Sequence, residues 1–95
     1  MAVTVSEFQQ HLPEFEEIAI GDGIAVNGIE FEIVDKETRS PAPGETVYYL
    51  FLRDDEQVEV LSWNPAHTVE AVWLYDEGTD PMSEGDEVES VEYSG

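Results

Sequence analysis

The fold of this chain is indicated most strongly by residues 24–35, which read IAVNGIEFEIVD. The pair Asn27-Gly28 is a strong hairpin signal, because both central residues of a type I′ turn need a positive φ. After that turn, apolar and acidic residues alternate, which is the pattern of a half-buried strand. We therefore predict an antiparallel hairpin whose second strand points these side chains into a core: Ile29, Phe31 and Ile33.

On the N-terminal side of the hairpin, the sequence favours a short helix over residues 6–17. Ser6 and Gln9 have the spacing of a capping box, with Ser6 as the N-cap. Apolar residues then recur at helical spacing, at Phe8, Leu12 and Phe15. Pro13 lacks a backbone N–H and should break or kink the helix just before it.

On the C-terminal side, we predict a loop at 36–45 and then a series of strands. The run at 46–53 is apolar on both faces, which favours a central strand covered on both sides. A further strand is expected at 57–63. Residues 68–75 are rich in β-branched and aromatic side chains, which favours a strand, with a short helix as the open alternative.

The character of the sequence changes near residue 76. From there to residue 95 there are many acids and no Lys, Arg or His. We therefore predict a compact domain over 1–75, followed by a mostly flexible acidic tail. Alternating apolar residues around 87–93 leave open that the tail adds an edge strand.

These elements amount to one short helix and about five strands joined largely by hairpins. The predicted fold class is mainly β (α+β), an antiparallel β-meander that forms a small barrel or roll. Residues 21–35 resemble the opening of SH3-like small barrels, and this resemblance implies a fold and no particular activity.

The charge is extreme for a chain of 95 residues. Lys and Arg number 3 against 23 Asp and Glu, for a net charge of −20. This composition resembles that of cytosolic proteins of salt-accumulating haloarchaea. The resemblance implies a cytoplasm with molar salt, where a Debye length of about 3 Å screens repulsion between carboxylates. Such a surface would hold hydrated monovalent cations without specificity.

Several functional classes are disfavoured by composition. There is no cysteine, which excludes disulfides and thiolate chemistry. No apolar run is long enough to span a membrane, and residues 1–7 lack the basic start of a signal peptide, so we expect a cytoplasmic protein without membrane contact. Nucleic-acid binding is not expected, because phosphate contacts need basic residues.

Catalytic motifs are not evident, and we predict no catalytic, cofactor-binding or metal-binding residue. The two histidines, His11 and His67, have acidic neighbours in the sequence. A metal-dependent enzyme that uses either histidine with nearby carboxylates is the weakest of three hypotheses, because acidic neighbours arise by chance in so acidic a chain.

The strongest functional signal is a set of large side chains in the predicted strands. One face of the sheet could be buried by a second copy of the chain, which would make this a homodimeric interaction or accessory protein, with another protein as a further possible partner. The alternative is a ligand-binding barrel whose cavity is lined by Tyr48, Trp63 and Trp73, with His67 at its mouth. The candidate interface or pocket residues are Tyr48, Tyr49, Phe51, Trp63, His67, Trp73 and Tyr75.

Overall fold

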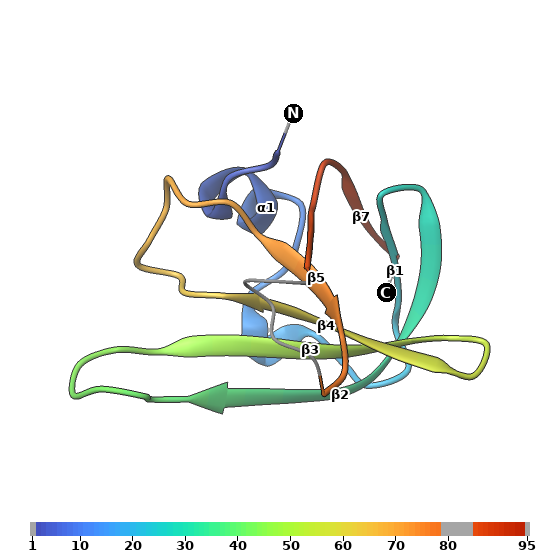
Figure 1. The fold of residues 1–95 in the computed structure, drawn as a ribbon, viewed down its shortest axis with the longest axis horizontal. Helices are drawn as coiled ribbons and strands as arrows, with labels where there is room; N and C mark the ends of the chain where they lie inside the picture. Colours follow the sequence, from blue (N-terminus) through green and yellow to red (C-terminus); the bar gives the residue numbers. More distant parts are fainter. Residues whose placement is uncertain (1, 79–84, 95) are drawn as a thin grey trace.

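A computed structural model describes residues 2–78 and 85–94. In these residues the strands form one antiparallel sheet in the order β6-β5-β4-β3-β2-β1-β7, which curls into a half-barrel (Figure 1). The mainly β fold is therefore confirmed. The elements are α1 (Val5–Gln10), the 3₁₀ helix η1 (Phe15–Glu17), β1 (Gly23–Val26), β2 (Ile29–Arg39), β3 (Val47–Asp54), β4 (Gln57–Trp63), β5 (Trp73–Asp76), β6 (Asp86–Glu87) and β7 (Val91–Ser94).

The β1–β2 hairpin forms where the sequence predicts it. Asn27 and Gly28 have φ values of 53° and 81°, as this turn requires. Phe31 and Ile33 are buried, but the prediction that Ile29 points into the core is wrong, since 48% of it is exposed. The reason is that β3 pairs with β2 only from Glu32 onward, so no strand covers that flank of Ile29.

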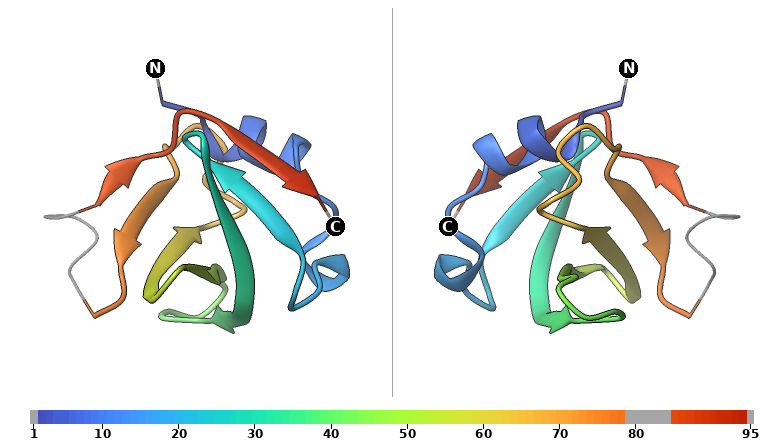
Figure 2. Two further views of the ribbon diagram at one scale, coloured as in Figure 1. Left: turned by 90° about the vertical axis from the view of Figure 1, so that its right-hand side faces the viewer. Right: turned by 90° about the vertical axis from the view of Figure 1, so that its left-hand side faces the viewer.

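Strand β2 is longer than expected and joins two parts of the sheet. It pairs with β1 as far as Glu32 and with β3 from there to Arg39, with a register shift between Ile33 and Asp35. A bulge of this kind bends a strand, and Figure 2 shows the resulting curl of the sheet. The predicted loop at 36–45 is therefore wrong for its first four residues, which pair with β3.

The N-terminal helix is interrupted as predicted, but its cap lies elsewhere. Helix α1 ends at Gln10, before Pro13, and η1 follows. Thr4 is the N-cap instead of Ser6: its Oγ1 accepts from the N–H of Glu7 at 3.2 Å and donates to Glu7 Oε1 at 3.1 Å. The N-cap therefore lies two residues before the predicted one, at Thr4, which is extended and forms a β-bridge with Ala71.

Three distant segments meet in a ring of backbone hydrogen bonds. The N–H of Val3 donates to the carbonyl of Val88 (2.7 Å), Val88 donates to Val72 (2.9 Å), and Val72 donates to Val3 (3.4 Å). Residues 68–71 lie in a turn, a bend and a bridge, and the strand predicted over 68–75 is limited to β5. The helical alternative for this segment is not observed.

The C-terminal residues contribute to both ends of the sheet. Strand β6 pairs with β5, and β7 pairs with β1 along its whole length. Val88 and Val91 belong to the hydrophobic core, which therefore extends beyond residue 75. Residues 79–84 of the predicted tail lie outside the described residues.

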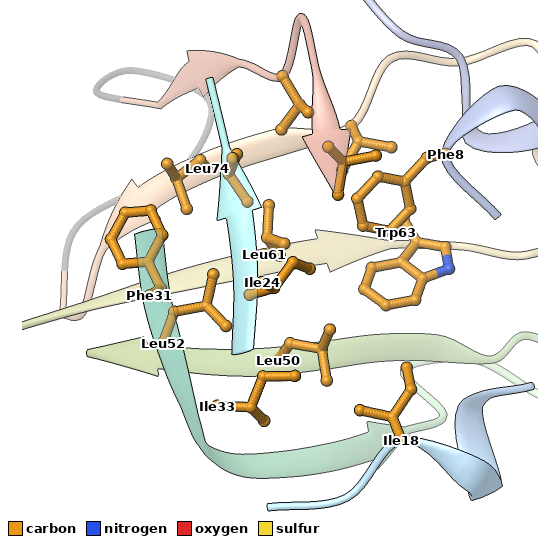
Figure 3. Close-up of a cluster of buried hydrophobic side chains, with 14 of the residues drawn as sticks. Phe8, Ile18, Ile24, Phe31, Ile33, Leu50, Leu52, Leu61, Trp63 and Leu74 are labelled. Carbon is orange, nitrogen blue, oxygen red and sulfur yellow. The ribbon is translucent and has the colours of Figure 1, made fainter. Parts of the chain in front are cut away.

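The core fills the concave side of the curled sheet (Figure 3). It receives side chains from α1, from the segment after η1 and from the strands on both halves of the sheet. Among the labelled residues of Figure 3, Phe8 and Ile18 approach the strand residues Leu50, Leu61 and Trp63. No helix in the part of the chain that the structure describes is long and apolar enough to cross a membrane.

Candidate functional site

The candidate residues of β3 and β4 divide between the two faces of the sheet. Leu50 and Leu52 are fully buried on the concave side, so their neighbours Tyr49 and Phe51 point to the outer side. Tyr48 lies opposite Trp63 in the β3–β4 register, on the concave side. Alternation along the strands therefore separates an inner aromatic group from an outer one.

The inner group is an aromatic cluster at one end of the half-barrel. Tyr48 stacks on Phe15 of η1 with ring centroids 4.1 Å apart and planes 4° from parallel. Trp63 lies nearly perpendicular to both rings, with centroids 6.0 Å from Phe15 and 5.7 Å from Tyr48. Phe8 also contacts Trp63 edge to face, at 4.9 Å. Phe15, Tyr48 and Trp63 line a pocket of about 230 Å³.

Phe15, like Phe8, belongs to this cluster but was not among the sequence candidates. Its helical spacing with Phe8 and Leu12 indicated only an apolar helix face. The structure instead places it in η1, after the break at Pro13, where its ring reaches Tyr48. A stacking partner so distant in sequence leaves no local signal.

The outer group is an apolar patch on β3, β4 and β5, which we call the outer patch. Its register pairs are Phe51 with Val60 and Val60 with Tyr75. Val60 and Tyr75 are buried although they do not belong to the core cluster on the concave side. The members of the outer patch are Tyr49, Phe51, Val60, Trp73 and Tyr75.

Charged groups flank the outer patch. The guanidinium of Arg39 lies over the ring of Tyr49, 4.7 Å from its centroid, and also pairs with Glu37 at 2.6 Å. Arg39 and Glu77 both line a depression of about 460 Å³ over the patch. Burial on this face raises the pKa of Tyr75, whereas a hydrogen bond with Ser62 opposes that change.

Among the described residues, Trp73 lies apart from the pocket that Tyr48 and Trp63 line. Trp73 pairs with Ser62, which lies next to Trp63 in β4 and points to the opposite face. Trp73 shares only a separate depression with Trp63, and neither Tyr48 nor His67 is among its described lining residues. The sequence showed that these residues are aromatic, but the face of each depends on the strand bounds.

The histidines occupy separate surface positions. His67 lies in the β4–β5 connection, where its Nδ1 is 3.0 Å from Glu70 Oε2. His11 is exposed and caps the C-terminus of α1. Within residues 2–78 and 85–94, no three His, Asp or Glu side chains are placed to hold a metal ion.

An acidic group lies at the far end of β4. Glu59 is opposite Asp76 in the β4–β5 register and on the same side of the sheet as Leu61. Partial burial raises the pKa of the Glu59 carboxyl, and the nearby charges of Asp76, Asp54 and Asp86 raise it further. This carboxyl is therefore easier to protonate in the folded protein than in an open chain.

Comparisons with protein-family models, with curated proteins and with solved structures found no match for this chain. The functional argument therefore rests on the geometry of the outer patch.

Proposed function

We propose that this protein is an interaction protein that associates with a second copy of itself through the outer patch. The observation that supports this proposal is the gathering of Tyr49, Phe51, Trp73 and Tyr75 around the buried Val60. These side chains come from three adjacent strands and form one apolar area on a chain with 23 acidic residues. Contiguous apolar areas on small proteins commonly mark interfaces.

The chemistry of the outer patch suits a protein interface. Tyr and Trp supply large contact areas with few rotatable bonds, and they are enriched among the residues that dominate binding energy. Tyr49, Phe51 and Trp73 retain partial exposure in the single chain. Covering them would remove apolar surface from water, which stabilises a complex by about 25 cal/mol per Å² before the costs of association.

The arrangement of charges favours a second copy as the partner. Arg39 lies on β2 and Glu77 directly follows β5, so the two charges lie at opposite sides of the patch. In a two-fold symmetric dimer, any contact from one side to the other occurs twice. Arg39 of each copy can then approach the acidic side of the other, where it neutralises charge that the partner brings.

Net charge sets the condition for this association. Two copies at −20 each repel strongly in dilute buffer, and molar salt screens most of that repulsion. The proposal therefore predicts a dimer in molar KCl that dissociates as salt is removed. A basic partner protein would show the opposite dependence, because salt weakens attraction between unlike charges.

The experiment is a measurement of molar mass by light scattering across a KCl series, for the protein and for Tyr49→Asp. We expect twice the chain mass in molar KCl for the unchanged protein and the single mass for Tyr49→Asp. Val69→Asp is the matched control, because Val69 is 86% exposed and lies outside the outer patch. A single chain mass for the unchanged protein at every salt concentration would overturn the proposal.

A further inference from the structure

The chain has two asparagines, and the residue that follows each one gives it a different reactivity. Asn27 precedes Gly28, whereas Asn64 precedes Pro65. In an open chain, the backbone nitrogen of the next residue can attack the side-chain carbonyl carbon of asparagine. Glycine eases this attack because it has no side chain to obstruct the approach, and proline prevents it because it has no N–H. Asn27 is therefore the asparagine with a reactive sequence context.

In the folded chain, residues 87–90 bind the side chain of Asn27 at both of its polar atoms. Asn27 Oδ1 accepts from the N–H groups of Glu89 and Ser90 at 2.6 and 3.2 Å. Its Nδ2 donates to the carbonyl of Glu87 at 3.2 Å. The backbone N–H of Asn27 also donates to the carbonyl of Ser90, at 3.0 Å. The carboxamide is thus fixed by a segment that is distant in the sequence.

These hydrogen bonds oppose reaction at Asn27. Ring closure requires the Asn27 Cγ to come within bonding distance of the Gly28 nitrogen, so the carboxamide must first turn away from residues 87–90. That segment is anchored by Val88, which is fully buried and whose N–H donates to the carbonyl of Val72 at 2.9 Å. Gly28 is exposed, so water reaches the turn. Opening of residues 87–90, and not access of water, therefore limits the reaction.

We propose that Asn27 is a deamidation site whose reaction is controlled by the docking of residues 87–90. In the first step, the Gly28 nitrogen loses its proton and forms a bond to Asn27 Cγ. The bond from Cγ to Nδ2 breaks, and ammonia leaves with that proton, which gives a cyclic succinimide. Water then adds to a ring carbonyl carbon, and ring opening yields aspartate or isoaspartate. Water is the only co-reactant, and no electron donor or acceptor is needed.

Either product weakens the contact that controls its formation. Aspartate lacks the N–H donor for the carbonyl of Glu87 and places an oxygen acceptor opposite that oxygen. Isoaspartate also lengthens the backbone by a methylene carbon, within a turn whose geometry fits two residues. Hydrolysis does not restore the amide. The modification therefore releases residues 87–90 from Asn27 in one direction.

The test measures deamidation of Asn27 by peptide mapping with mass spectrometry at mildly alkaline pH in molar KCl. The folded protein is compared with a synthetic peptide of residues 24–31 in the same buffer. We expect the protein to react at least about tenfold more slowly than the peptide, because residues 87–90 must open first. Asn64 should stay unmodified in the protein, since Pro65 has no N–H. Equal rates for protein and peptide would overturn the proposal.

Two valine variants distinguish release of residues 87–90 from unfolding of the whole chain. Val88→Ala weakens the anchor of this segment and should raise the deamidation rate of Asn27 about tenfold. Val60→Ala removes the same methyl groups from a buried valine on the outer side of the sheet, and it should leave the rate unchanged. Equal acceleration by the two variants would show that global unfolding exposes Asn27, which contradicts the proposal.

Hydrogen exchange in the unchanged sequence keeps the proposal testable if Val88→Ala does not fold. The protein is aged until part of Asn27 has become isoaspartate, and the modified and unmodified forms are separated. The amides of Glu89 and Ser90 should exchange faster in the modified form, whereas those of β4 should keep their rates. Equal protection of Glu89 and Ser90 in both forms would show that Asn27 does not fix this segment, and the proposal would be wrong.

Discussion

The side chain of Asn27 binds the backbone of Glu89, which lies 62 positions further along the chain. Oδ1 of Asn27 accepts a hydrogen bond from the N–H of Glu89 at 2.6 Å. The same oxygen accepts from the N–H of Ser90 at 3.2 Å, and Nδ2 donates to the carbonyl of Glu87. Asn27 is also the first residue of the β1–β2 turn, with φ of 53°. One residue therefore shapes the hairpin and fastens the segment that links β6 to β7.

Replacement of Asn27 by glycine should separate these two roles. Glycine tolerates the positive φ, so the turn is retained while the side-chain hydrogen bonds are lost. We expect Asn27→Gly to lower the free energy of unfolding by about 1–2 kcal/mol in denaturant titrations. Asp55→Gly is the control, because Asp55 has the same φ sign in the β3–β4 turn; it should change stability little. If both glycine variants lost the same free energy of unfolding, backbone flexibility and not the side-chain hydrogen bonds would explain the effect.

The C-terminal strands should be required for folding. Val88 is fully buried, and its backbone belongs to the ring that joins Val3, Val72 and Val88. We expect Val88→Ala to lower the free energy of unfolding by about 1–3 kcal/mol, through lost burial and a residual cavity. The exposed Val69→Ala should stay within about 0.5 kcal/mol of the unchanged protein. A chain that ends at residue 78 should fail to fold, and a cooperative unfolding transition in that truncation would contradict this expectation.

Glu59 should make stability fall as pH rises. Its folded-state pKa is above the ordinary value of 4.5, so the folded state holds the proton more tightly than the unfolded state. The favourable contribution is complete below pH 4.5 and is lost as pH rises through the folded-state pKa. Glu59→Gln should therefore stabilise the protein at neutral pH and flatten this part of the pH profile.

A matched variant distinguishes burial of Glu59 from net charge. Glu56→Gln removes the same charge from the exposed β3–β4 turn. Free energies of unfolding from denaturant titrations between pH 4 and 7 would be compared for both variants (a range set by carboxyl titration). Parallel pH profiles for the two would show that overall charge, and not the surroundings of Glu59, governs the effect.

Ala25 offers a test of repulsion between surface carboxylates. It lies between Glu30 on β2 and Glu92 on β7, directly opposite both in register. Ala25→Lys places a cation between two acids and should raise the free energy of unfolding by about 0.5–1 kcal/mol in dilute buffer. Molar KCl should remove most of that gain. Ala25→Met adds an unbranched side chain without charge. An equal gain in the free energy of unfolding for Ala25→Met at both salt concentrations would exclude an electrostatic origin.

Local sequence signals predicted several elements correctly because their causes are local. The β1–β2 turn follows from the conformational freedom of Asn27 and Gly28, and the strand after it follows from alternation. The break in the N-terminal helix follows from Pro13. The position of the N-cap shows the limit of such signals. Thr4 and Ser6 both precede a helix-favouring run, and the tertiary structure, in which Thr4 forms a β-bridge with Ala71, places the cap at Thr4.

The sequence alone determined the class of fold, the acidity of the surface and the large aromatic content of β3, β4 and β5, since propensity, charge and alternation act between near neighbours. Tertiary structure decided which face each aromatic residue occupies, so Tyr48 and Trp63 meet Phe15 on the inside while Tyr49 and Trp73 lie on the outside. It also decided that Val88 completes the core. The physical reason is that a one-residue change in strand register reverses every side chain, and register is set by contacts between residues far apart in the chain.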